Sequence, residues 1–245
     1  MKCVALLSGG VDSATASMLV KKSGYEVYGL NFRRVRKEFE TEYARRFAER
    51  HGINFKVVDA DVTSLIREAQ ETSLSYVTMS GQQWEFLWGR NIIYLVLAAN
   101  YAASVGASLI VVGFAPHDAS RTDDPSSCDY PDCHPRVLSD LSDLLTITLH
   151  RTTRPQPNSG SIRIGAPLMD KVKTKVDVFK LALELGINIG DTISCYTPIR
   201  TSEGWRSCGQ CLACHHRRAA LTILQKQGFN VPLREITYNK DGRSN

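Results

Sequence analysis

The amino-acid sequence predicts an α/β protein whose core is a parallel five-stranded sheet with helices on both faces. Short apolar segments alternate with amphipathic segments along most of the 245 residues. Strands that alternate with helices imply right-handed crossovers and a parallel sheet. Hydrophobic residues make up 43% of the chain and charged residues 22%, which is typical of a folded globular protein and argues against disorder. A chain of this length holds one large domain, or one domain with a small appendage.

Five apolar segments are the expected strands, and the amphipathic or buried segments between them are the expected helices. The strands are 2–7, 25–32, 53–60, 109–112 and 161–167, and the helices are 12–22, 38–51, 62–69, 91–103, 136–149, 175–187 and 213–227. Ligands of parallel sheets bind beyond the carboxyl ends of the strands. Residues 8–13, 31–36 and 113–124 follow three of these strands, so we expect them to line one crevice.

Charge and cysteine content narrow the class of protein. The net charge of +5 points only weakly to an anionic ligand and does not argue for nucleic acid. Residues 92–116 are uncharged over the length of a membrane span, but polar residues interrupt them, and their halves are typical of a buried helix and a β-branched strand. No secretory signal opens the sequence, and seven cysteines are an odd number. We therefore expect no membrane span and a reducing, cytoplasmic compartment.

The stretch "LLSGGVDSATA" at residues 6–16 joins the first strand to the first helix. It lacks the lysine of a Walker-type phosphate loop and the glycine spacing of a Rossmann loop. The glycine backbone, the helix N-terminus and the hydroxyls of Ser8 and Ser13 predict an anion nest that fits pyrophosphate. The alternative is a plain tight turn. Asp12 either places Mg²⁺ on the phosphates or caps the helix that it begins.

This stretch resembles the PP-loop of the ATP pyrophosphatase superfamily, whose members cleave ATP to AMP and pyrophosphate and usually adenylate a substrate oxygen. The resemblance implies a nucleotide-binding fold of the adenine nucleotide α-hydrolase type. It also implies a set of nucleotide-binding residues: Leu7, Ser8, Gly9, Gly10, Val11, Asp12, Ser13, Ala14 and Asn31.

Four of the seven cysteines lie within twenty residues of one another, at Cys195, Cys208, Cys211 and Cys214. This spacing places four thiolates where one tetrahedral Zn²⁺ takes them all, and a closed Cys₄ site is usually structural. An iron–sulfur cluster is the rival metal centre. His215 or His216 is the alternative to one of the thiolates.

A PP-loop at the start and "SCY…CGQCLAC" at the end resemble the 7-cyano-7-deazaguanine synthase family, over residues 2–233. "GRN" at residues 89–91, "DYPDCHP" at 129–135 and "APLMDKVKTKVDVFKLALELGI" at 166–187 resemble further family segments in the same order. The resemblance implies that ATP, Mg²⁺ and ammonia convert 7-carboxy-7-deazaguanine to 7-cyano-7-deazaguanine through adenylated intermediates, with release of AMP and pyrophosphate. It also implies a homodimer.

Residue roles follow from the resemblance only where a motif matches. Asp12, Ser13, Arg90 and Lys175 are the expected catalytic residues, and Asn91 and Asp132 are expected to bind the substrate. The alternatives are a salt bridge at a helix end for Arg90, a turn within the loop for Asp132, and a surface position for Lys175. We expect Cys133 to be buried rather than nucleophilic, because adenylation requires no thiol.

The sequence departs from the family after its second strand, where basic residues between Arg33 and Lys37 replace the usual F-D-Y-G-Q. The chain is therefore either a divergent member acting on the usual substrate or a relative that activates another carboxylate. Two further alternatives are a PP-loop enzyme that modifies a tRNA base and a zinc-stabilised nucleotide-binding module without turnover. We expect no stable complex with nucleic acid, because the net charge is low and no RNA-binding appendage is visible.

We divide the chain into a nucleotide-binding α/β domain at residues 1–190, a zinc-binding segment at 191–233 and a polar tail at 234–245. The zinc-binding segment is expected to end in a helix that the metal holds against the nucleotide domain. The polar stretch at residues 115–135 is long for a loop in a compact domain, so it is either functional or disordered.

Overall fold

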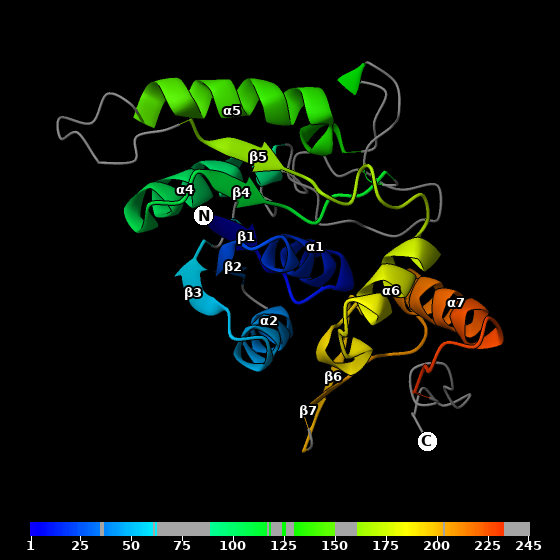
Figure 1. Ribbon diagram of the computed structural model, residues 1–245. Coiled ribbons are helices and arrows are strands. Elements are labelled where there is room, and N and C mark those ends of the chain that lie inside the picture. Colours follow the sequence, from blue (N-terminus) through cyan, green and yellow to red (C-terminus); the bar gives the residue numbers. More distant parts are fainter. Residues whose placement is uncertain are drawn as a thin grey trace, which may run out of the picture.

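The computed structural model describes residues 1–34, 37–60, 62, 89–116, 118, 124–125, 130–149, 161–202 and 204–232. The predicted fold class is confirmed (Figure 1). The strands of the main sheet are β1 (Lys2–Leu6), β2 (Glu26–Arg33), β3 (Asn54–Asp59), β4 (Leu109–Val111) and β5 (Arg163–Gly165). The helices are α1 (Val11–Lys22), α2 (Glu38–Arg50), α4 (Arg90–Val105), α5 (Pro135–Leu149), α6 (Lys175–Glu184) and α7 (Leu212–Lys226), with short 3₁₀ turns η2 (Pro131–Cys133) and η3 (Ile189–Asp191).

The main sheet is parallel throughout, with the strand order β3-β2-β1-β4-β5. The chain first builds outward from β1 to β3 and then returns to add β4 on the other side of β1. The connections that leave β1 and β4 therefore diverge to opposite faces, and the crevice between them is the place where a parallel sheet binds its ligands. The loop with the "SGGVDS" sequence begins at this point.

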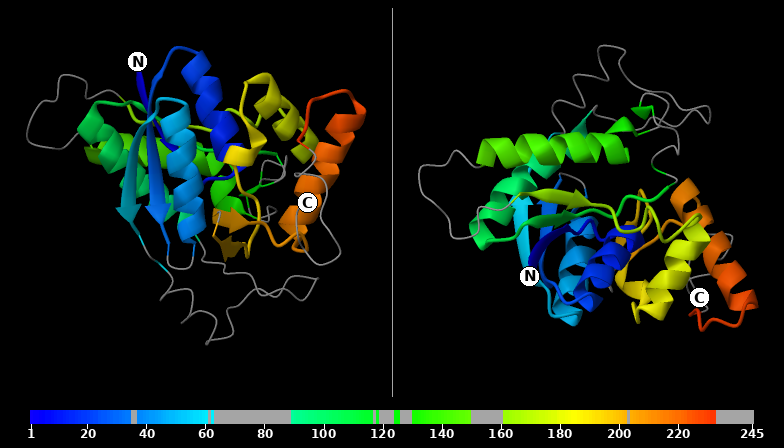
Figure 2. Two further views of the ribbon diagram at one scale, coloured as in Figure 1. Left: turned by 90° about the horizontal axis from the view of Figure 1, so that it is seen from below. Right: turned by 45° about the horizontal axis from the view of Figure 1, so that its top comes forward.

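Two hydrophobic cores lie on the two faces of the sheet, because successive side chains of a strand point to opposite faces. Cys3 and Ala5 of β1 belong to the core that α1, α2, α6 and α7 cover, whereas Val4 belongs to the core under α4 and α5. Figure 1 shows α4 and α5 on one side of the strands and α1 and α2 on the other, and the left view of Figure 2 shows α1 and α2 beside β2 and β3.

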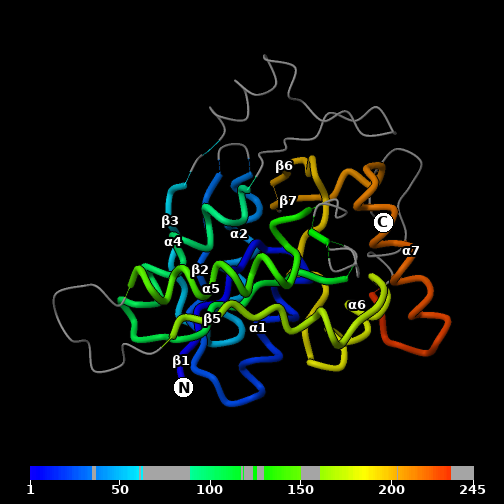
Figure 3. The backbone as a smooth tube through the Cα atoms, turned by 90° about the horizontal axis from the view of Figure 1, so that it is seen from above, coloured from blue at the N-terminus to red at the C-terminus, as the bar shows by residue number. Residues whose placement is uncertain are grey.

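The C-terminal helix lies beside α6, as Figures 1 and 3 both show. Leu221 and Leu224 of α7 are fully buried in the same core as α1 and α6. Between α6 and α7 the chain also forms a small antiparallel hairpin of β6 (Ile199–Thr201) and β7 (Gly204–Arg206), which the sequence patterns did not predict. Each of these strands has three residues, too few to show an alternating pattern.

The expected elements agree with the structure to within a few residues at most ends. The uncharged stretch 92–116 divides as predicted into most of helix α4 and strand β4, and no helix in the described part of the chain is long and apolar enough to cross a membrane. The helix expected at 62–69 and the tail at 234–245 lie outside the described residues, apart from residue 62. The division at residue 190 remains a prediction.

Candidate active site and metal centre

The loop between β1 and α1 is closed by its own serine hydroxyls. The Ser8 and Ser13 hydroxyl oxygens lie 3.1 Å apart, the Ser13 hydroxyl accepts a hydrogen bond from the Ser8 backbone N–H at 3.2 Å, and it donates one to the Gly10 carbonyl at 3.0 Å. These bonds tie the two ends of the loop to each other. The N-terminus of α1 follows this loop directly and brings the positive end of the helix dipole to it.

Gly9 is held tightly between two other parts of the chain. Its φ of +81° lies in the left-handed region, and a Cβ at this position would lie 2.5 Å from the Glu40 carbonyl oxygen. Its own carbonyl accepts a hydrogen bond from the Ile193 backbone N–H at 2.9 Å. The loop is therefore fixed from one side by α2 and from the other by the segment that leads to the first clustered cysteine.

Asp12 pairs with Lys175 across the crevice. The helix α1 has Gly10 as its N-cap and no side-chain cap, so the capping role considered for Asp12 has no support in the geometry. One carboxylate oxygen, Oδ2, bonds the Lys175 ammonium. The other, Oδ1, is buried and has no hydrogen-bond partner among the described residues. Lys175 is the first residue of α6, whose start is fixed by a capping box between Thr174 and Asp177.

A cavity of about 350 Å³ opens at the carboxyl ends of β1, β2 and β4. Each of the three segments expected to form the crevice contributes to it. Its lining includes most of the residues that carry chemistry at this edge of the sheet: Ser8, Asp12, Ser13, Asn31, Arg34, Glu40, Arg90, Asn91, Gly113 and Asp118. A second cavity of about 630 Å³ lies beyond Asp12 and Asp118, which line both, and Gly10 and Lys175 open into it. The two cavities therefore meet beside residues 8–13, which we call the phosphate loop after the role that the sequence predicts for them.

Four residues that were expected to bind the nucleotide, Leu7, Val11, Ala14 and Asn31, have buried side chains that support the loop between β1 and α1. Asn31 is 3% exposed, donates to the Leu7 carbonyl at 2.6 Å and accepts from the Thr41 hydroxyl at 2.7 Å. The side chains of Leu7, Val11 and Ala14 are buried in the core. The structure thus brings the predicted set together at one edge of the sheet, with Asn31 joining β1, β2 and α2.

Arg90 and Asn91 form the first turn of α4 and line the 350 Å³ cavity opposite the phosphate loop. Asp132 belongs to the described part of the polar loop, and its Oδ2 accepts the Asn91 backbone N–H at 3.0 Å. The Asn91 amide in turn lies 3.4 Å from the Cys133 sulfur. Asp132 therefore caps α4 from outside the helix, and it is not among the residues that line the cavity.

Cys133 is buried, as expected. Burial and the neighbouring negative charge of Asp132 raise the pKa of its thiol far above the usual range. The thiol is therefore protonated at neutral pH, which does not suit a nucleophile.

Aromatic side chains line part of the 350 Å³ cavity, and none of them is among the site residues that the sequence motifs predict. The Phe32 and Tyr94 rings stack with centroids 4.6 Å apart and planes 10° from parallel, and Phe114 and Tyr130 also line the space. Phe32 lies near the carboxyl end of β2 and Phe114 follows β4, so both belong to segments that were expected to line the crevice. The sequence does not mark Tyr94 as a cavity residue, because it lies one turn into a helix whose apolar residues predict only burial in the core.

Gly113 is a second residue that no motif singled out. A Cβ at this position would lie 2.5 Å from the Ser13 backbone nitrogen and 2.7 Å from the Asp12 carbonyl carbon. The end of β4 therefore passes directly against the first turn of α1. Only glycine allows this approach, because any side chain would push the phosphate loop away.

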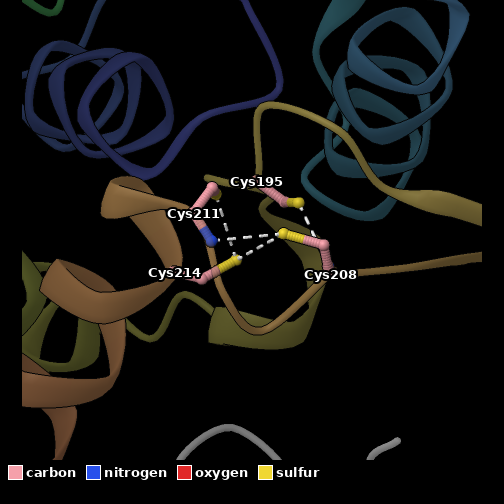
Figure 4. A group of neighbouring side chains, drawn as sticks. All are labelled: Cys195, Cys208, Cys211 and Cys214. Atoms are coloured by element: carbon pink, nitrogen blue, oxygen red, sulfur yellow. Dashed lines mark hydrogen bonds between the residues drawn. The ribbon is translucent and has the colours of Figure 1, made fainter. Parts of the chain in front are cut away.

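The four clustered cysteines come together as predicted (Figure 4). Their sulfur atoms all lie within 4.8 Å of one another. The Cys211 and Cys208 sulfurs lie 3.5 and 4.0 Å from that of Cys214. Four thiolates at Zn–S distances of about 2.3 Å have sulfurs about 3.8 Å apart in a tetrahedron. The cluster is therefore placed to hold one metal ion.

The cysteine thiols form a connected set. Hydrogen bonding with the Cys195 and Cys214 sulfurs lowers the pKa of Cys211. All six cysteines that the structure describes are free. Outside the cluster, burial raises the pKa of Cys3 to about 12, so Cys3 remains a protonated core residue.

A family model described as queuosine biosynthesis protein QueC matches residues 2–225. The 7-cyano-7-deazaguanine synthase of Rickettsia conorii is 31% identical over 245 aligned residues, covering 96% of this chain and 99% of that protein. That of Legionella pneumophila subsp. pneumophila is 31% identical over 233 residues, covering 89% and 90%. A solved 4-thiouridine synthetase–RNA complex with bound ATP is 18% identical with a TM-score of 0.46, covering 85% of this chain and 44% of that chain. The family match spans nearly the whole sequence, from the phosphate loop to the four cysteines, and the chain belongs to the queuosine biosynthesis protein QueC family.

Proposed function

We propose that this protein is an ATP-dependent ligase that converts 7-carboxy-7-deazaguanine and ammonia to 7-cyano-7-deazaguanine. The observation that carries the proposal is the joined cavity. Ser8, Asp12, Ser13, Arg90 and Asn91 line it together with aromatic side chains, which supports binding of ATP phosphates beside a flat substrate. Family membership and relatives named 7-cyano-7-deazaguanine synthase support the same reaction.

The chemistry requires two activations. A carboxylate resists attack by an amine, because it is resonance-stabilised and negatively charged. Its oxygen attacks the α-phosphorus of ATP, pyrophosphate leaves, and ammonia then displaces AMP to give the amide. The amide oxygen attacks a second ATP in the same way, and loss of AMP with the remaining N–H protons leaves the nitrile. Both carboxylate oxygens thus leave on AMP.

The phosphate loop stabilises the charge that develops on the leaving pyrophosphate. Hydrogen bonds within the loop hold the Ser8 and Ser13 hydroxyls in place, so little reorganisation is needed during the reaction. The Lys175 ammonium adds a positive charge at the same place. The unpartnered Oδ1 of Asp12 suits a Mg²⁺ that neutralises the phosphates of bound ATP.

The substrate half of the cavity suits a flat ring that carries a carboxylate. Stacked Phe32 and Tyr94, together with Phe114 and Tyr130, offer ring faces and edges to a deazapurine. Arg90 supplies positive charge for the carboxylate or the α-phosphate. We propose that Asn91 contacts the substrate and that Asp132 contributes by holding Asn91 in place.

The basic segment at residues 33–37, which replaces the family's usual turn, contributes Arg34 to the lining of the same cavity. Arg34 is held by Glu40 at 2.6 Å, and both line the space, whereas Arg33 pairs with Asp59 on the surface. Val35 and Arg36 lie outside the described residues. We propose that the Arg34–Glu40 pair forms the nucleotide end of the cavity, and that the substrate remains that of the family.

We further propose that the four cysteines hold one structural Zn²⁺, because a closed set of four thiolates suits zinc and leaves no open position for catalysis. Free cysteines support a reducing cytoplasmic compartment. Exposed apolar side chains on α4 and α5 support a homodimer; they are Ile93, Val96, Leu97, Leu144 and Ile147.

The test is mass spectrometry of the products formed from 7-carboxy-7-deazaguanine, ATP, Mg²⁺ and ammonium. The nitrile, AMP and pyrophosphate should appear together, with two ATP consumed per nitrile and the amide as an intermediate. The Ser13→Ala variant is the matched control, and it should form neither amide nor nitrile at an appreciable rate. Formation of neither pyrophosphate nor amide from this mixture, with ATP binding intact, would point to a different carboxylate as the substrate.

A further inference from the structure

We propose that Arg217 is a positioning residue for the ATP site, which it serves by holding residues 189–195, here called the bridging segment, against the phosphate loop. The proposal rests on the proposed function in one respect, namely that the phosphate loop binds ATP. Arg217 lies on α7, in the metal-binding C-terminal part of the chain, and no motif marked it.

Arg217 is a charged residue with only 3% of its surface exposed. Its guanidinium donates to the Ile189 carbonyl at 2.6 Å, to the Thr192 hydroxyl at 3.1 Å and to the Ser194 hydroxyl at 3.4 Å. All three acceptors belong to the bridging segment. A buried charge is costly unless it is hydrogen-bonded, so these bonds fix the segment and the guanidinium to each other.

The bridging segment touches the phosphate loop directly. The Ile193 N–H, between two of the residues that Arg217 holds, donates to the Gly9 carbonyl at 2.9 Å. The left-handed Gly9 is the residue that permits the loop's turn. Ile193 and Ser194 also line the 630 Å³ cavity beside Gly10 and Lys175. A shift of this segment therefore moves the loop that receives the phosphates.

A second route runs through α6. The Arg217 guanidinium carbon lies 5.5 Å from the centroid of the Phe179 ring, and the Lys175 ammonium lies 6.0 Å from the centroid of the same ring. Phe179 is fully buried, so its ring is a fixed surface shared by both cations. Arg217 thereby supports the helix turn from which Lys175 reaches Asp12.

The cysteine cluster connects the bridging segment to α7, because it includes one residue of each. Cys195 ends the bridging segment, and Cys214 lies one helical turn before Arg217 on α7. Residues three apart lie on the same face of a helix, and both side chains are buried. The position of the cysteine cluster therefore affects the phosphate loop, because Arg217 on α7 holds the bridging segment and the bridging segment bonds to Gly9.

The test compares Arg217→Lys with Arg218→Lys, the same change at the next residue of α7. Isothermal titration calorimetry with ATP and Mg²⁺, without deazaguanine or ammonium, measures the dissociation constant in the absence of turnover. We expect it to rise about tenfold for Arg217→Lys, because hydrogen bonds from a charged donor are lost. Arg218→Lys should stay within about twofold of the original protein. Bound metal, measured by elemental mass spectrometry, should be unchanged in both.

Steady-state kinetics separates positioning from mere stability. Positioning predicts a raised KM for ATP with little change in the KM for the carboxylate substrate. Loss of stability alone predicts a lower melting temperature with the ATP dissociation constant of the folded protein unchanged, and that result would overturn the proposal.

If Arg217→Lys does not fold, Thr192→Val is the second test of the proposal. It removes one hydrogen-bond acceptor of the Arg217 guanidinium, and valine has nearly the same shape as threonine. We expect weaker ATP binding for this variant too. An unchanged dissociation constant in Thr192→Val would reject the proposal. The calorimetric result does not depend on which carboxylate is the substrate, so it stands apart from failure of the proposed reaction.

Discussion

The ammonium of Lys175, at the first turn of α6, bonds the carboxylate of Asp12, at the first turn of α1, although 163 residues separate them in the chain. This pair links two helix N-termini at the edge of the phosphate loop. It holds the lysine beside residues 8–13, and Oδ1 of Asp12 has no hydrogen-bond partner in the part of the chain that the structure describes.

Replacing Lys175 by Met should lower kcat by about 10²-fold, because a fixed positive charge is removed from the developing phosphate charge. Asp12→Asn should cause a loss of similar size, and the double variant should lose less than the product of the two, since the residues act as a pair. Pyrophosphate release measures the rates.

Lys171→Met is the matched control for this pair, because Lys171 is an exposed lysine on the approach to α6. Its kcat should stay near that of the original protein. Normal pyrophosphate release by Lys175→Met would remove Lys175 from the catalytic set.

Gly113→Ala should abolish or severely reduce ATP binding. The added Cβ would lie 2.5 Å from the Ser13 backbone nitrogen, where backbone rather than a flexible side chain must yield. Gly165→Ala, one strand further along the sheet, is the control, because its Cβ would lie 3.3 Å from the flexible Leu109 side chain and no nearer than 3.9 Å to the Ile110 carbonyl oxygen. Calorimetry with ATP distinguishes the two variants, and equal ATP affinities would disprove the close approach of β4 to α1.

Cys208→Ser should lose the bound metal and lower the melting temperature, because a structural metal contributes its binding free energy to folding. Elemental analysis and thermal unfolding measure the two effects. Chelator treatment of the original protein should cause the same destabilisation. Cys3→Ala, at a buried cysteine of the sheet, should keep the metal while losing some stability. Protein purified without any metal would refute the assignment of the cluster.

Asp177→Ala should destabilise the protein at neutral pH by about 1 kcal/mol, the usual worth of an N-terminal cap. Burial raises the pKa of Asp177, but hydrogen bonds from the Lys173 N–H and from the hydroxyl and N–H of Thr174 outweigh it and lower the pKa overall. A lowered folded-state pKa stabilises the protein above the unfolded value of about 3.9, and this stability is lost as the pH falls through the folded pKa.

Denaturant unfolding between neutral pH and pH 3 checks this sign. The difference between the original protein and Asp177→Ala should be constant at neutral pH and shrink in the acid range. Asp170→Ala, at an exposed aspartate nearby, should show no comparable change. A difference that grew as the pH fell would contradict the lowered pKa.

The amino-acid sequence determined the features that depend on neighbouring residues. The alternation of apolar and amphipathic segments predicted the parallel sheet, the glycines and serines of residues 8–13 predicted a phosphate loop, and four cysteines predicted a metal centre. Each is a local pattern, since strand period, turn conformation and ligand spacing are set within a few residues.

Only the tertiary structure decided what surrounds these patterns. Lys175 reaches Asp12, Gly113 passes against Ser13, Tyr94 stacks on Phe32, and Arg217 holds the segment behind Gly9. Nothing in the local sequence distinguishes Tyr94 from a core residue or Arg217 from a surface one. Their roles depend on the strand order and on the packing of α7 against α6. Such contacts join residues distant in the chain, so they depend on how the elements pack and leave no local pattern in the sequence.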